Sequence, residues 1–205
     1  MNKPPLDAAE RRTIRMEKLT VGFALTGSFC TFAKVVPQIQ AVADAGYRVL
    51  PIMSEMSYQT DTRFGKAKDF ITTIEQITGQ PIIHTVKDSE PIGPKNLLDA
   101  MIIAPCTGNT LAKLAGGITD SCVTMAAKAS LRNQNPLIVA VSTNDGLGAS
   151  GKNIGALANT AQVFLVPFGQ DAPQKKPNSL VAHMDLILPT LEEALQGRQI
   201  QPVLV

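Results

Sequence analysis

The sequence contains no tryptophan, only two tyrosines and only two histidines among its 205 residues. With so few aromatic rings there is little on which nucleobases could stack or that could sit at a membrane interface. The formal net charge is only +2, which provides no basic surface for a polyanion. Nucleic acids and bilayers are therefore weak candidates, and small molecules and other proteins remain.

Cysteine is also scarce, and its pattern argues against two kinds of cross-link. The three cysteines, Cys30, Cys106 and Cys122, are odd in number and stand among apolar or small residues. They predict reduced thiols in a cytoplasmic protein rather than a disulfide framework. There is no C-x-x-C motif, and His84 and His183 are far apart in the sequence, so no metal site is predicted.

The first 18 residues, MNKPPLDAAERRTIRMEK, are charged and contain no apolar run. We expect them to form an exposed N-terminal arm, and neither a signal peptide nor a membrane anchor. Residues 19–205 contain no internal repeat, linker or low-complexity tract, so they predict one domain. A domain of this size buries about 70% of the surface that its unfolded chain exposes, which is enough to fold without cross-links.

Nearly continuous apolar runs of strand length predict five strands that are covered on both faces. The runs span residues 19–25, 48–53, 99–104, 136–141 and 162–167. Apolar residues at helical spacing between the first two runs, followed by Gly46 where a C-cap belongs, predict a βαβ unit. Further helices are expected over residues 65–78, 109–115, 120–133, 153–161 and 190–196. This alternation predicts a single-domain α/β fold with a doubly wound, mostly parallel sheet of the Rossmann or flavodoxin type.

In such a sheet, ligands bind beyond the carboxyl ends of the strands, and four of the five ends here are unusual. The first run is followed by Thr-Gly-Ser (26–28) and a helix, which can present N–H groups and a hydroxyl to an anion. Ser54 follows the second run, and it lies beside Ser28 if the two strands are neighbours. The motif is neither G-x-G-x-x-G nor a P-loop, and an ordinary strand-to-helix turn is the alternative.

The third and fourth strand ends are rich in small, uncharged residues. APCTGNTLAKLAGGITDS (104–121) follows the third run, and STNDGLGASGKN (142–153) follows the fourth. So many small residues in succession suggest that a ligand lies against the backbone, because a simple turn needs only one glycine or asparagine. Two uncharged ends facing one crevice fit a planar ring, so a phosphorylated, flavin-like ligand is predicted.

Together, these motifs resemble the family of homo-oligomeric flavin-containing cysteine decarboxylases and their relatives. TGS, SE, the segment 104–121 and the polar loop after the fourth run carry the resemblance, and AKDFITTIEQITG (67–79) is similar to the second crossover helix of that family. The resemblance implies FMN as the cofactor. It also implies homo-oligomers, either trimers whose interfaces complete the flavin site or dodecamers built from them.

The resemblance also implies which residues hold FMN. The phosphate would be bound by Gly27, Ser28 and Ser54. The ribityl chain and the ring would be lined on one side by Pro105, Cys106, Thr107 and Asn109, and on the other side by Ser142, Thr143 and Asn144.

One position departs from the decarboxylases of the family. These enzymes carry a catalytic histidine shortly before the third strand, and in this sequence that position falls on Pro91. His84 stands earlier in the chain and is interpreted as a histidine at the edge of a strand. The departure argues against decarboxylation of a peptidyl-cysteine.

The remaining segments resemble one branch of the family. TDTRFG (60–65), SEPIGPK (89–95), MAAKASLRN (125–133) and the stretch 167–195 are similar to small flavoprotein subunits that act in spore formation. With a nicotinamide-binding partner, these proteins oxidise a dihydrodipicolinate to pyridine-2,6-dicarboxylate.

This branch implies a small dicarboxylate substrate. Positive charge and hydrogen-bond donors for such a dianion would come from Arg63, Lys175, Lys176 and Asn178, with a solvated loop as the alternative. Two other functions stay open: a flavin-dependent decarboxylase of the phosphopantothenoylcysteine type, and a flavin-loaded scaffold that stabilises the nicotinamide-binding partner without catalysing the reaction.

Overall fold

The computed structural model describes residues 19–205, and the predicted N-terminal arm, residues 1–18, lies outside the described residues. Within residues 19–205, a seven-stranded sheet has the order β2-β1-β3-β4-β7-β6, with β5 paired to β4 beside this path. The strands are β1 (Thr20–Leu25), β2 (Arg48–Met53), β3 (Ala100–Cys106), β4 (Leu137–Thr143), β5 (Val163–Leu165), β6 (Phe168–Gly169) and β7 (Leu180–Ala182).

The first five strands are parallel neighbours in the order β2-β1-β3-β4-β5. This is the doubly wound order in which the chain reverses its direction of winding between β1 and β3, so that a crevice forms at their carboxyl ends. The predicted fold class is confirmed. Every residue of β3 is buried, as its continuous apolar run predicts for a central parallel strand.

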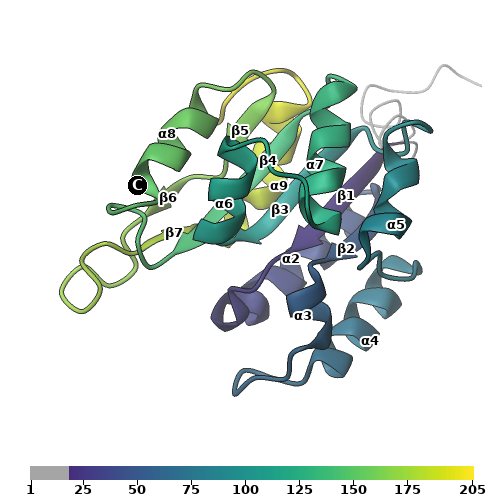
Figure 1. Cartoon of the computed structure of the whole chain (residues 1–205), viewed down its shortest axis with the longest axis horizontal. Coiled ribbons are helices and arrows are strands. Elements are labelled where there is room, and N and C mark those ends of the chain that lie inside the picture. The colour runs from purple at the N-terminus through teal and green to yellow at the C-terminus, as the bar shows by residue number, and fades with distance from the viewer. Residues whose placement is uncertain (1–18) are drawn as a thin grey trace, which may run out of the picture.

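Helices cover both faces of the sheet (Figure 1). On one face, α2 (Phe32–Asp44) packs on α4 (Ala67–Thr78) and α9 (Ile187–Ala194). The other face carries α5 (Val86–Ser89), α6 (Gly108–Ala115), α7 (Cys122–Arg132) and α8 (Gly151–Ala158). The short segments are α3 (Glu55–Gln59), η1 (Phe29–Thr31), η2 (Glu90–Ile92) and η3 (Met184–Leu186).

Each of the six long helices expected from the sequence is present, with its ends shifted by a few residues. Gly46 follows the C-cap of α2 with φ of 93°, a left-handed conformation that favours glycine at this position. The helices α3 and α5 were not predicted, because one helical turn is too short to display an apolar period.

The region after β4 differs from the prediction. The expected strand over residues 162–167 is shorter, and β5 ends at Leu165. The chain then forms a hairpin, β6 and β7, and β7 pairs antiparallel with Ser142 and Thr143 at the end of β4. Pro167 has no N–H to donate to a ladder, which favours a break between β5 and β6. The loop predicted over residues 167–179 therefore begins with a strand.

The three cysteines are free, and Cys30 is exposed whereas Cys106 and Cys122 are buried. Among residues 19–205, no helix combines the length and the apolar character needed to cross a membrane. In the same part of the chain, no group of three or more histidine, cysteine, aspartate or glutamate side chains is arranged to hold a metal ion.

Candidate functional site

A buried threonine joins the carboxyl ends of β1 and β3. The hydroxyl of Thr26 donates to the carbonyl oxygen of Pro105 at 2.7 Å and accepts the N–H of Thr107 at 3.1 Å. Thr26 is only 2% exposed, so both bonds satisfy groups that water does not reach. The two strand ends that form the crevice are thereby held at a fixed separation. The sequence places Thr26 in the Thr-Gly-Ser motif but does not indicate this role.

Three helices begin around this crevice, and each starts with a hydroxyl cap. The side chain of the cap accepts the N–H of the residue three positions further on, at 3.2 to 3.3 Å. The caps are Ser54 for α3, Thr107 for α6 and Ser121 for α7. The other N–H groups of a first helical turn have no partner within the helix, and the positive end of the helix dipole lies there. The crevice is therefore suited to an anion such as a phosphate.

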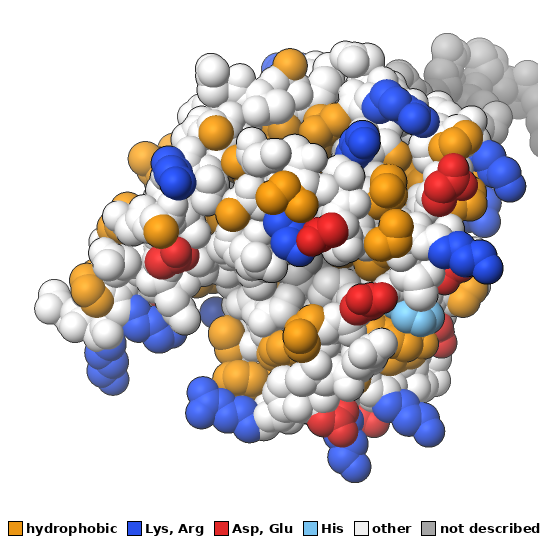
Figure 2. All heavy atoms as spheres, in the orientation of Figure 1, with side chains coloured by type: hydrophobic (Ala, Val, Ile, Leu, Met, Phe, Trp, Pro, Cys, Tyr) orange, Lys and Arg blue, Asp and Glu red, His pale blue; other side chains and the backbone are white. Residues whose placement is uncertain are grey.

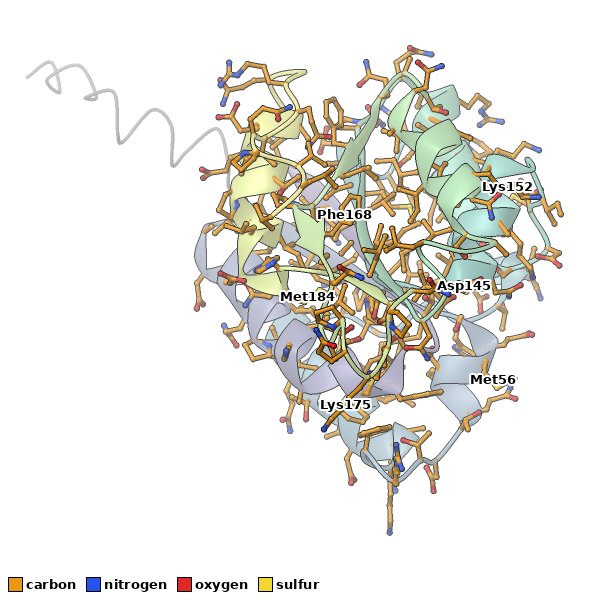
Figure 3. All side chains as sticks on the ribbon, turned by 90° about the vertical axis from the view of Figure 1, so that its left-hand side faces the viewer. Met56, Asp145, Lys152, Phe168, Lys175 and Met184 are labelled. Carbon is orange, nitrogen blue, oxygen red and sulfur yellow. The ribbon has the colours of Figure 1, made fainter. Side chains whose placement is uncertain are left out.

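A cleft of about 750 Å³ opens between these helix starts. Of the residues predicted to bind FMN, the cleft is lined by Gly27, Ser54, Thr107 and Asn109. It is also lined by residues that were not predicted to bind a ligand: Thr26, Glu55, Met56, Gln59, Thr60, Thr110, Lys113, Asp120 and Ser121. Met56 is 64% exposed and projects from α3 at the rim (Figure 3). Asp120 and Ser121 belong to the segment 104–121, which follows the third strand. The positions of the two helices predicted around this segment are the signal in the sequence that could have indicated these two residues.

An ion pair forms one wall of this cleft. The ammonium of Lys113 on α6 donates to both carboxylate oxygens of Asp120, at 2.8 and 2.9 Å. This hydrogen bond lowers the pKa of Asp120 below its usual value. Because Asp120 already neutralises Lys113, the phosphate-sized anion that the cleft suits would be bound mainly by N–H and hydroxyl donors.

A second cleft of about 490 Å³ lies between the start of α6, the loop after β4 and the start of α8. Asn109 lines this cleft as well as the first one, and Thr143 and Asn144 line it on the opposite side. The structure therefore brings Asn109 close to two of the three residues predicted at the end of β4.

Asp145 organises the loop after β4, and Figure 3 shows it to the right of the centre, between Lys152 and Met56. Its carboxylate accepts hydrogen bonds from the hydroxyls of Thr143 and Ser150, and these bonds lower its pKa. Gly108, the first residue of α6, packs directly on this cluster. A Cβ at Gly108 would lie 2.6 Å from Oγ1 of Thr143 and 2.7 Å from Oγ of Ser150, so only glycine fits here without a shift.

The remaining side chains predicted to bind the flavin are either hydrogen-bonded to other side chains or buried. The hydroxyl of Ser28 bonds to that of Ser142 at 2.8 Å, which joins the end of β1 to the end of β4. Ser54 follows β2, which is adjacent to β1, so the condition for placing it beside Ser28 is met, and its hydroxyl bonds to that of Ser57 at 2.8 Å. Pro105 and Cys106 are buried in β3, and burial raises the pKa of the Cys106 thiol, which is therefore neutral near pH 7.

The residues predicted to bind the substrate lie on two separate loops. Arg63 is exposed between α3 and α4, with its guanidinium 4.8 Å from the centre of the Phe64 ring. Lys175, Lys176 and Asn178 are exposed on the loop between β6 and β7. Lys176 pairs with Asp171 at 3.4 Å. In Figure 1 the loop between β6 and β7 projects at the left of the molecule, and the loop between α3 and α4 lies at its lower end. Among the described residues, no hydrogen bond or ion pair joins Arg63 to the three others.

His84 and Pro91 also lie outside the cleft. The ring of His84 stacks on Tyr58 of α3, with ring centres 3.7 Å apart, and the preceding residue, Ile83, bridges to Ile52 of β2. This is the strand-edge position expected from the sequence. Pro91 lies in η2 and has no titratable group.

The sheet order, the crevice between β1 and β3 and the hydroxyl-capped helix starts define an α/β protein of the flavodoxin-like class with a cleft suited to an anion at its topological switch point. The chain belongs to the Flavoprotein family, whose model matches residues 9–184. This finding confirms the family resemblance seen in the sequence.

Individual relatives agree with this assignment. The chain is 49% identical over 185 residues to the B subunit of dipicolinate synthase of Bacillus subtilis (strain 168), and the match covers 90% of this chain and 92% of the relative. The structure is similar to the crystal structure of the dipicolinate synthase B subunit from Bacillus halodurans C, with a TM-score of 0.86, 48% identity and coverage of 93% and 97%. The FMN-dependent cysteine decarboxylase SpaF shares the fold at 18% identity, with a TM-score of 0.66 and coverage of 89% and 98%.

Proposed function

We propose that this chain is the FMN-binding B subunit of a dipicolinate synthase that acts in the cytoplasm during spore formation. Together with the nicotinamide-binding A subunit of the synthase, it converts dihydrodipicolinate to dipicolinate, pyridine-2,6-dicarboxylate. The main support is the crevice between β1 and β3, ringed by capped helix starts, in a chain that is 49% identical over 90% of its length to a relative of that name. The overall reaction removes two hydrogen atoms from the dihydro ring, and the nicotinamide nucleotide of the A subunit is the final electron acceptor.

The donors around the crevice fit FMN. Gly27, Ser54 and the start of α3 offer N–H and hydroxyl groups to a phosphate, and hydrogen bonds to a charged group contribute about 1.5 to 3 kcal/mol each. A cleft of about 750 Å³ has the size of a cofactor site. Thr107 and Asn109 lie in the same cleft, where the ribityl chain and the ring would follow the phosphate. When bound, FMN would supply a two-electron redox group.

The rest of the predicted FMN site is part of the proposal. Ser28 would bind the phosphate together with Gly27 and Ser54, and Ser142, Thr143 and Asn144 would line the other side of the ribityl chain and the ring. Pro105 and Cys106 would form the floor beneath it. We also propose a homo-oligomer, a trimer or a dodecamer, because a cleft open to solvent in one chain is completed when a neighbouring copy covers it.

The substrate would be bound by Arg63, Lys175, Lys176 and Asn178. In one chain these side chains are exposed on two loops, so a second copy or a closing movement of the loops must bring them to a common dianion. Decarboxylation of a phosphopantothenoylcysteine-type substrate is less favoured. Pro91 stands where the decarboxylases carry a histidine, and His84 is stacked on Tyr58.

The visible absorption spectrum of the purified protein tests the cofactor. We expect a flavin spectrum, either in the protein as purified or after incubation with FMN. A colourless protein that does not take up FMN would refute the proposal.

Mixing this protein with its purified nicotinamide-binding partner tests the reaction. We expect the flavin absorbance to bleach when dihydrodipicolinate is added and to return when the partner and an oxidised nicotinamide nucleotide follow. If the partner by itself oxidises the substrate at full rate, this chain is a flavin-loaded scaffold. If a peptidyl-cysteine releases carbon dioxide instead, it is a decarboxylase.

A further inference from the structure

A groove of about 440 Å³ runs between α6 and α7. It lies beside the cleft of about 750 Å³ in which we propose that FMN binds, called the flavin cleft below. Its floor is apolar and is formed by Leu114, Ile118 and Leu131. Ile118 is 50% exposed, although it is a large aliphatic residue in a loop that could have carried a polar one. Figure 2 shows hydrophobic side chains gathered over α6 and α7, with Lys and Arg side chains next to them. Exposed apolar surface rimmed by charge is typical of an interaction site.

The charge at the rim of this α6–α7 groove has one sign. Lys128 and Arg132 line the groove one helical turn apart on α7, and both are exposed. Neither α6 nor α7 contains an acidic residue, and within residues 19–205 neither cation belongs to an ion pair. Two like charges at this spacing repel each other. The last turn of a helix favours a cation, which accounts for the sign of Arg132 but not for Lys128 or the apolar floor.

Lys113 connects the groove to the flavin cleft, because its side chain lines both. Unlike Lys128 and Arg132, Lys113 is neutralised by Asp120 within the same chain. A segment seated in the groove would therefore lie against one wall of the proposed flavin site, with two uncompensated cations at its other end.

We propose that the α6–α7 groove docks a helical segment of the nicotinamide-binding partner. The segment would place apolar side chains on Leu114, Ile118 and Leu131 and carboxylates opposite Lys128 and Arg132, as an amphipathic helix does in an apolar groove. The inference rests on the proposed function and adds the place where the two proteins meet. Charge complementarity selects an acidic, apolar segment, and the shared wall at Lys113 brings the two redox sites close together.

The test compares two double variants of the FMN-loaded protein. Lys128→Glu with Arg132→Glu reverses the charge of the groove, and Arg48→Glu with Lys68→Glu makes the same change at exposed positions on β2 and α4. The binding of the purified nicotinamide-binding partner to each variant is measured by calorimetry at low and moderate salt. Flavin content and melting temperature are recorded for each variant.

We expect the groove variant to bind the partner at least about tenfold more weakly, because like charges now face each other across the contact. We also expect a flatter dependence on salt, because the attraction that salt screens has been removed. The control variant should match the unmodified protein, and flavin content should be unchanged in both. Ile118→Gln should weaken binding through the groove floor without changing the charge of the groove.

Three outcomes would overturn the inference. If the partner binds the unmodified protein and the groove variant equally, the groove is not the docking site and the proposed function stands. If the partner binds neither of them, the proposed function fails together with the inference. If the groove variant changes the sedimentation of this protein in the absence of the partner, the groove is an interface between copies of this chain.

Discussion

The crevice between β1 and β3 and the loop between β6 and β7 are both predicted from the sequence to bind ligands, but they are held in different ways. In the crevice, side-chain hydrogen bonds join residues that are far apart in the chain, such as Thr26 to Pro105 and Ser28 to Ser142. In the loop, Lys175 and Lys176 both donate their N–H to the carbonyl of Ala172, and only the end of the loop is tied to a distant segment, by the bond from the N–H of Leu147 to the carbonyl of Asn178. The sheet fixes the first region, whereas the tip of the loop is held by bonds within the loop.

This contrast indicates where a site can be located from sequence. Residues just after parallel strands arrive at one edge of the sheet whatever the loops do, so Gly27, Ser54 and Thr107 meet in one cleft. Residues within long loops have no such constraint. Variants that disturb the crevice should therefore have large effects on cofactor binding, and variants in the loop should have small ones.

The largest effect is expected at Ser28. Replacing Ser28 with Asp should remove most of the bound FMN, because a carboxylate would face the phosphate in a partly buried site and like charges there cost several kcal/mol. Ser28→Ala is the control and loses only the hydroxyl, whose bond to Ser142 is worth about 1 kcal/mol. The ratio of flavin to protein absorbance after dialysis measures both. Equal flavin content in the two variants would place the phosphate elsewhere.

A smaller effect is expected at Gly108. A Cβ there would lie within 3.0 Å of oxygen atoms from Thr143, Asp145 and Ser150, so Gly108→Ala must push the start of α6 away from the loop after β4. Overpacking of this kind costs about 1 to 3 kcal/mol. We expect a lower melting temperature and weaker FMN binding, measured by calorimetry and by flavin titration.

Gly155→Ala is the matched control for this change, because a Cβ at Gly155 within α8 meets nothing within 4 Å. It should leave FMN binding unchanged and stabilise the helix by up to about 1 kcal/mol. If both alanine variants behave alike, the contact at Gly108 does not position the cleft.

The smallest effect on the fold is expected in the loop between β6 and β7. Replacing Lys175 and Lys176 together with Gln should leave flavin content and melting temperature unchanged, because both side chains are exposed and, within residues 19–205, only Lys176 of the two has an ion pair. Figure 3 shows Lys175 pointing away from the body of the molecule.

If these lysines bind the substrate dianion, the KM of the reaction with the nicotinamide-binding partner should rise while kcat changes little, and the dependence on ionic strength should flatten. If the loop docks the partner instead, the lost activity should return at high concentrations of that protein. If the variant has an unchanged KM and an unchanged dependence on salt, the segment QKKPNS (174–179) is a solvated loop without a role in binding.

The same contrast explains which parts of the site were missed. Lys113 lies on a helix whose apolar period was recognised, but the sequence does not say that its charged side faces the cleft. Met56 lies on α3, which is too short to be predicted. Thr26 was visible as the first residue of a strand-end motif, yet its bonds to β3 depend on a neighbour 79 positions away.

Local patterns in the sequence were sufficient for the parallel strands and most of the helices, because burial requires continuous apolar runs and helical periods. They were also sufficient to show that small polar residues follow β1, β3 and β4. The early end of β5 and the hairpin that pairs with the end of β4 emerged only from the folded chain. Pairing between distant segments depends on which partner completes the edge of the sheet, and no local pattern encodes that choice. For the same reason, only the fold could place Asn109 between two clefts and leave Lys128 and Arg132 without an ion-pair partner beside an apolar groove within residues 19–205.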